Sequence, residues 1–167
     1  MSSPSSAMGA YLLEDTRQKI GKHDLKREWW ARRGVGLIRS KLAFGDYCLP
    51  PEVVVDTKAS IYELAMDIAH EHERFKREMV AARDAGTVLV VLVENDDGVE
   101  SLFDLSCWSE DPAHFAVRKG AKRPIDGMRL AHACATMEER YGVRFEFCAP
   151  GDSAEKVLEI LNRGGGA

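Results

Sequence analysis

The chain has 167 residues, of which 45% are hydrophobic and 30% charged, and a formal net charge of -4 at pH 7. This length is enough for one domain with a real core and too short for two domains of ordinary size. No apolar run approaches the length that spans a bilayer, so the sequence predicts no membrane partner.

The charge is unevenly distributed. Residues 16–45 contain nine Lys and Arg against two acids, whereas residues 94–111 contain seven acids and no Lys or Arg. Phosphate binding needs local positive potential rather than a basic total, so the first region can serve a nucleic acid. A solvated helix face is the alternative interpretation.

The sequence predicts an intracellular, cytoplasmic protein. The opening residues, MSSPSSAMGA, lack the basic start and apolar core of a signal peptide. The four cysteines are widely spaced without a C-x-x-C pair, which argues against a zinc site and a disulfide framework. We expect a disordered leader over residues 1–9, one domain over residues 10–162 and a flexible tail over residues 163–167.

The first expected elements surround the basic region. Residues 10–13 predict a short strand that delivers Glu14 and Asp15 to its end. Residues 21–34 predict a helix, and residues 36–39 predict a second strand. Arg39 and Lys41 are two residues apart, so in an extended chain they share a face and can contact DNA; ordinary surface charge is the alternative.

Residues 44–58, FGDYCLPPEVVVDTK, predict a β-hairpin that turns at its two prolines. The β-branched run of residues 53–55 is typical of a buried strand, yet it ends in Asp56, Thr57 and Lys58. Asp46 and Asp56 then lie near one end of the hairpin as hard oxygen ligands for a divalent metal. The Thr57 carbonyl can add a ligand and Lys58 can orient water, although a surface ion pair is the alternative.

The second half alternates helices and strands. Residues 60–85 predict one long helix, with Ser60 as N-cap and Glu63 completing a capping box. We expect a central strand over residues 87–94, an irregular acidic excursion over 99–112 and a basic loop over 118–123. A helix over 127–141, a strand over 143–148 and a helix over 152–161 complete the α/β pattern, which predicts a layered sheet with helices on both sides.

Three short motifs resemble the XPF-type, excision-repair structure-specific nucleases of the PD-(D/E)XK superfamily. That family reads D-x-R-E, then GDY, then E-R-K; the counterparts here are Asp15-Thr16-Arg17-Gln18, Gly45-Asp46-Tyr47 and Asp56-Thr57-Lys58. Order and approximate spacing agree, while Gln18, Asp56 and Thr57 depart from the family residues. Arg74 and Glu78 match the spacing of a later arginine and glutamine in the family, and Glu78 adds a charge.

The resemblance implies a restriction-endonuclease-like mixed β-sheet and a metal-dependent DNA endonuclease. Asp15, Asp46, Asp56 and Lys58 would be catalytic, and Mg2+ (or Mn2+) would be held by Asp46, Asp56, the Thr57 carbonyl and Asp15, with Glu14 as the fallback for Asp15. DNA contacts are expected from the basic side chains Arg17, Arg39, Lys41 and Arg74. The implied substrate is branched or flap-like DNA, and the implied assembly is a homodimer involving the helices after residue 127.

Two rival functions stay open. The first is a catalytically weakened DNA-binding or scaffold domain, because Gln18 and Thr57 have lost charges that the family motif carries. The second is a homodimeric junction resolvase or restriction-type nuclease of the same superfamily.

Overall fold

The computed structural model describes residues 11–19, 21–43, 45–49 and 53–163. The predicted leader, nearly all of the predicted tail and the prolines of the predicted hairpin turn lie outside these residues. The strands are β1 (Tyr11–Asp15), β2 (Gly36–Ser40), β3 (Tyr47–Leu49), β4 (Val53–Lys58), β5 (Val88–Glu94) and β6 (Arg144–Cys148). They form one mixed sheet in the order β2-β1-β3-β4-β5-β6.

The sheet changes direction around β3. This strand is antiparallel to both of its neighbours, β1 and β4. On one side of it, β1 pairs in parallel with β2. On the other side, β4, β5 and β6 are parallel to one another. The predicted antiparallel pairing within the hairpin is therefore confirmed, with Tyr47 opposite Val55. Each parallel crossover needs a connecting helix, which explains the alternation read from the sequence.

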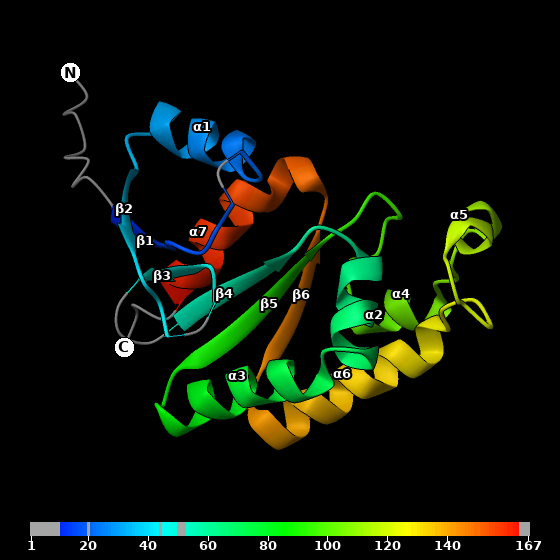
Figure 1. Cartoon of the computed structure of the whole chain (residues 1–167). Helices are drawn as coiled ribbons and strands as arrows, with labels where there is room; N and C mark the ends of the chain where they lie inside the picture. Colours follow the sequence, from blue (N-terminus) through cyan, green and yellow to red (C-terminus); the bar gives the residue numbers. More distant parts are fainter. Residues whose placement is uncertain (1–10, 20, 44, 50–52, 164–167) are drawn as a thin grey trace.

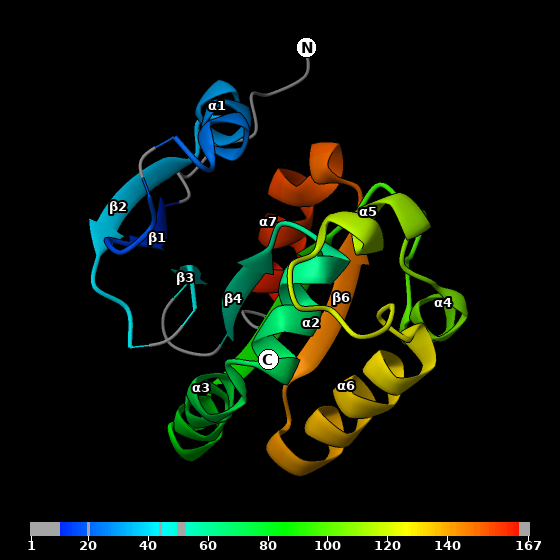
Figure 2. The ribbon, with the colours of Figure 1, turned by 45° about the vertical axis from the view of Figure 1, so that its right-hand side comes forward.

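Helices cover both faces of the sheet. They are α1 (Asp24–Arg32), α2 (Ile61–Ala69), α3 (His72–Asp84), α4 (Leu102–Cys107), α5 (Pro112–Val117), α6 (Gly127–Tyr141) and α7 (Ser153–Arg163), with a 3-10 turn at Pro150–Asp152. Figure 1 shows α1 and α7 on one side of the strands and α2, α3 and α6 on the other, and the turned view of Figure 2 shows the same division. The predicted α/β fold, with helices on both sides, is confirmed.

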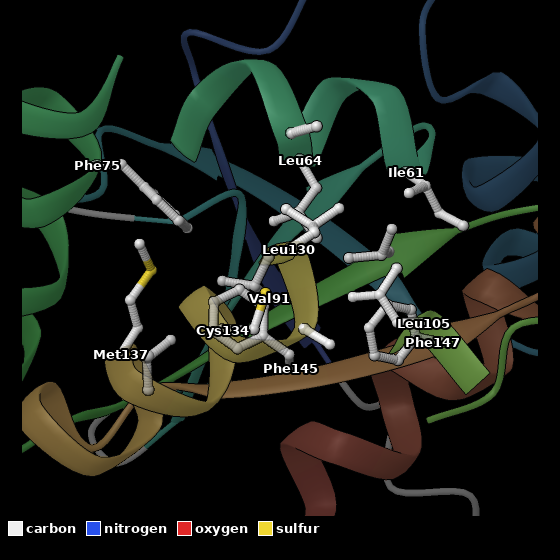
Figure 3. Packing of buried hydrophobic residues seen from close by; sticks show 14 of the residues in the cluster. Ile61, Leu64, Phe75, Val91, Leu105, Leu130, Cys134, Met137, Phe145 and Phe147 are labelled. Atoms are coloured by element: carbon white, nitrogen blue, oxygen red, sulfur yellow. The ribbon is translucent and has the colours of Figure 1, made fainter. Parts of the chain in front are cut away.

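The sheet separates two hydrophobic cores. The larger core joins alternate residues of β4, β5 and β6 to α2, α3, α4 and α6, and Figure 3 shows Phe75, Leu130 and Phe145 converging on it. The smaller core packs Trp30 and α7 on the opposite face. Strand β4 supplies both cores because its side chains alternate. Burying each large apolar side chain contributes about 1.5–3 kcal/mol to the stability of the fold, so the packing on both sides holds β4 firmly in the sheet.

The prediction of one helix over residues 60–85 is wrong. Helix α2 ends at Ala69, α3 begins at His72, and Figure 1 shows the two at a steep angle. The buried spacing continues from Ile61 and Leu64 into Phe75 and Met79, so periodicity gives no sign of the break. The break comes from tertiary packing, because α2 and α3 cover different parts of the sheet.

The prediction of an irregular excursion over residues 99–112 is also wrong. Ser101 accepts a hydrogen bond from the Asp104 backbone N–H and begins α4, and the Asp111 side chain accepts one from Ala113 and begins α5. Both helices are short, and the apolar periodicity of such short helices is too brief to recognise. The Ser60 N-cap is confirmed, with Glu63 N donating to its hydroxyl.

Candidate active site

Three adjacent strands bring three predicted aspartates to the same end of the sheet. The Asp15 backbone N–H donates to the Asp46 carbonyl at 2.8 Å, and the Asp46 N–H donates to the Val55 carbonyl at 2.8 Å. These bonds continue the β1–β3 and β3–β4 pairing by one step. Asp15, Asp46 and Asp56 are therefore positioned by the sheet itself.

The aspartates line a cleft of about 650 Å3 together with charged side chains from α2 and α3. Asp56 and Lys58 share the face of β4 that carries Val54, since side chains alternate along a strand. The acids of the cleft are Asp15, Asp46, Asp56, Glu63, Asp67 and Glu78. Its basic residues are Arg17, Lys19, Lys22, Lys58, Arg74 and Arg77.

Asp46 is held by Thr57 on the neighbouring strand. The Thr57 backbone N–H and hydroxyl both donate to Asp46 Oδ2, at 2.8 and 2.7 Å. Burial raises the pKa of Asp46, and the two Thr57 hydrogen bonds oppose this rise by stabilising the ionised form. Thr57, a departure from the family motif, thus orients the central carboxylate.

Asp56 and Lys58 form a buried ion pair that also includes Asp67 from α2. Lys58 Nζ lies 2.8 Å from Asp56 Oδ2 and 2.5 Å from Asp67 Oδ2. Burial raises the pKa of Asp56 to about 6, with the Asp46 charge adding to the rise and Lys58 opposing it. Burial alone would lower the pKa of Lys58, but its two carboxylates more than offset this and raise it.

Asp15 belongs to the cleft, and Glu14, the fallback, does not. Asp15 is ion-paired with Arg17, whose backbone N–H also donates to its carboxylate at 2.8 Å. Burial alone would raise the pKa of Asp15, but the hydrogen bonds from Arg17 outweigh burial and lower this pKa. Glu14 points to the opposite face, where Arg27 binds it at 3.0 Å and Arg39 at 3.5 Å.

The predicted DNA contacts divide into two groups. Arg17 and Arg74 line the cleft, where Arg17 is bonded to Asp15 and Arg74 to Glu71 and Asp67. Arg39 and Lys41 are exposed but are not among the residues that line it. The Arg39 guanidinium instead donates to the carbonyls of Thr16 and Gln18 at 3.1 Å.

Sequence reasoning missed Asp67 and noted Glu78 only as a departure. The Gly45 backbone N–H donates to Glu78 Oε1 at 2.8 Å, and burial, followed by the Asp56 charge, raises the pKa of Glu78. One signal pointed to Asp67: it is an acid at a buried position of an otherwise apolar helix face. The sequence could not show that this face of α2 covers Lys58.

The donor set suits a divalent cation of the magnesium type. Asp56 Oδ2 is buried and lacks a hydrogen-bond partner of good geometry, although Lys58 is close in distance. As they stand, no three His, Cys, Asp or Glu side chains within the described ranges converge tightly enough to hold a metal ion. Mg2+ needs only one or two protein carboxylates alongside water and phosphate, so Asp46 and Asp56 fit it.

None of the described helices has both the length and the apolar character that a membrane span requires.

The fold is a mixed α/β sheet that brings aspartates to adjacent strand ends beside a lysine. No protein-family model and no curated protein matches the sequence. Among solved structures, the chain is similar to XPF from Aeropyrum pernix, with 18% identity over 91% of this chain and a TM-score of 0.62. The same protein in complex with DNA gives 16% identity over 93% and a TM-score of 0.63.

The chain spans 65% of the length of each of these two XPF structures. Its fold is that of XPF, so the prediction of an XPF-type domain is confirmed for the fold.

Proposed function

We propose that the chain is a metal-dependent DNA endonuclease of XPF type. One observation carries the proposal: a single cleft holds Asp15, Asp46 and Asp56 from three adjacent strands beside the buried Lys58. The resemblance of the motifs to those of a nuclease family and the likeness in fold to XPF support the same reaction class.

Asp46 and Asp56 would hold Mg2+ or Mn2+, with the Thr57 carbonyl and Asp15 as further oxygen donors. The ion would supply concentrated positive charge to the scissile phosphate. Lys58 donates a hydrogen bond to the attacking water or to phosphate oxygen, because its pKa is raised and it stays protonated. The Thr57 hydroxyl orients the Asp46 carboxylate, and its hydrogen bond opposes the rise in the pKa of Asp46 that burial causes.

The substrate we propose is DNA, in a branched or flap-like form. A. pernix XPF has been solved in complex with DNA. On this chain, Arg17, Lys19, Lys22, Arg74 and Arg77 lie around the acids of the cleft and supply charge for phosphates. The preference for branched DNA rests on the resemblance of the sequence motifs.

We further propose a homodimer that pairs through α6, which is among the helices after residue 127 that were expected at the interface, and through α4, which was not. Phe103 on α4 and Met128 on α6 are exposed large hydrophobic side chains. In the proposed dimer these two side chains would be covered by the second chain, because contiguous exposed apolar surface is typical of protein contacts. Light scattering should give the mass of two chains; the mass of a single chain would contradict the dimer.

The deciding experiment is cleavage of labelled linear, splayed, flap and four-way DNA with Mg2+ or Mn2+. Wild type should cut, and Asp56→Asn and Lys58→Met should each lower the rate by a factor on the order of 10² or more. Asp84→Asn, on the exposed end of α3, is the matched control for loss of one acid and should cut like wild type.

The pattern of cutting separates the candidates. Binding of all four DNAs without any cutting would overturn the nuclease and favour the scaffold domain. Preference for the four-way DNA would favour a resolvase.

A further inference from the structure

The Lys58 ammonium is shared between two carboxylates that come from different elements. Asp56 reaches it from the same strand at 2.8 Å, and Asp67 reaches it from α2 at 2.5 Å. The Phe75 ring lies beneath it, with its centroid 5.3 Å from Nζ. All three charged side chains are buried, so their mutual attractions are little screened by solvent.

This sharing conflicts with a metal at Asp56. The Asp56 oxygen that contacts Lys58 is Oδ2, which is also the oxygen without a hydrogen-bond partner of good geometry. A divalent cation and an ammonium group at the same oxygen repel each other strongly in a buried setting. Lys58 therefore needs another acceptor when Asp56 binds a metal.

Asp67 has the position and the support to be that acceptor. Its Oδ2 makes the shorter of the two contacts to Lys58, and its Oδ1 accepts from Arg74 Nη2 at 3.4 Å. Helix α2 begins at the fixed Ser60 cap and buries Leu64 in the core, so the backbone that carries Asp67 is anchored. The carboxylate can keep Lys58 in the cleft without help from Asp56.

We propose that Asp67 is a positioning residue that takes the Lys58 ammonium from Asp56 and thereby frees Asp56 for a divalent cation. The inference rests on the proposed function, because it presupposes a metal at Asp56. The proposed role of Asp67 is to hold Lys58 so that Asp56 can bind the cation. A measurement of metal binding therefore tests this role without any DNA cleavage.

The test measures Mn2+ binding to the full chain by electron paramagnetic resonance. Asp67→Asn should weaken binding on the order of tenfold, because Lys58 is then left with Asp56 alone. Glu63→Gln is the matched control: it removes one acid of the same cleft and helix, one turn earlier, with Lys22 rather than Lys58 as its ion-pair partner. Its effect measures the simple loss of one negative charge.

A double-mutant cycle shows whether Asp67 acts through Lys58. In a Lys58→Met background, Asp67→Asn should change Mn2+ affinity no more than Glu63→Gln does. An equal loss with and without Lys58 would overturn the proposal and make Asp67 a ligand or a source of general charge. Unchanged affinity in Asp67→Asn would also overturn it.

A second variant and the Mn2+ binding of wild type separate the possible causes of a negative result. If Asp67→Asn fails to fold, Asp67→Ser tests the same loss of a carboxylate with a smaller side chain, and the same expectations apply. Absence of Mn2+ binding by folded wild type would overturn the proposed metal-dependent function and this inference together. Normal Mn2+ binding by both wild type and Asp67→Asn would overturn the role of Asp67 alone.

Discussion

Thr57 donates two hydrogen bonds to the same oxygen of Asp46, one from its backbone and one from its hydroxyl. Thr57→Val removes only the second and should lower the free energy of unfolding by about 1 kcal/mol. It should also weaken Mn2+ binding, because the pKa of Asp46, already raised by burial, rises further. Chemical denaturation and metal titration measure the two effects.

Thr57→Ser is the control for this prediction, because it keeps a hydroxyl within reach of Asp46. It should bind Mn2+ more tightly than Thr57→Val. Equal metal affinity in the two variants would show that the hydroxyl plays no part in orienting the carboxylate.

Gly45 has room for no side chain. Its φ is +72°, and an added Cβ would lie 2.0 Å from Val54 Cγ1 and 3.2 Å from the Val55 carbonyl oxygen. Gly45→Ala should lower the free energy of unfolding by about 2–4 kcal/mol through left-handed strain and overpacking. Gly86 has a similar φ of +69° but an open surrounding, so Gly86→Ala should cost only about 1 kcal/mol. Equal costs in urea denaturation would contradict the predicted clash.

Lys26 and Glu94 form a buried ion pair on the opposite face of the sheet, and Ser153 Oγ donates to the same Glu94 oxygen at 2.8 Å. Lys26→Met leaves the carboxylate buried without its cation and should cost about 3–5 kcal/mol of stability. The partly exposed pair of Lys22 and Glu63 provides the contrast, and Lys22→Met should cost less than about 1 kcal/mol.

Recovery in a double variant isolates the interaction of this pair. Lys26→Met with Glu94→Gln should be more stable than Lys26→Met alone, since no buried charge is left unpaired. A double variant that is less stable than the single one would contradict an unpaired buried Glu94 charge as the cause of the loss.

His23 should make stability depend on pH. Burial, followed by the nearby Lys26 charge, lowers the pKa of His23 to about 4 from 6.5. As pH falls below 6.5 the unfolded chain takes up a proton that the folded chain refuses until about pH 4. The free energy of unfolding therefore decreases as pH falls through this window, by up to about 1.4 kcal/mol per pH unit.

His23→Phe keeps a ring beside Tyr47 and should reduce this pH dependence. Urea denaturation at several pH values between 4 and 7 measures the slope. The exposed His132 on α6 is the control, and His132→Gln should keep the wild-type slope. An unchanged slope in His23→Phe would show that another group causes the dependence.

The sequence by itself determined the elements of the sheet and three strand ends of the cleft. The apolar run before Asp56 is a strand buried on both faces, and the Gly45-Asp46-Tyr47 motif stands at the start of its antiparallel partner. Alternation along a strand and the sharp change from apolar to charged residues are local properties. The α/β fold class and the placement of Asp46 and Asp56 at one end of the hairpin could therefore be predicted, whereas the choice of Asp15 over Glu14 came from the motif resemblance.

Only the tertiary structure decided which helix covers these strand ends. Asp67 on α2 and Glu78 on α3 reach the cleft because the helical segment is interrupted at residues 70–71. Glu14 lies on the far face of the sheet, where it pairs with Arg27. Periodicity reports which residues share a face of one element, but not what lies opposite that face. The partners of Lys58 come from a different element, and only packing of the two hydrophobic cores places them beside it.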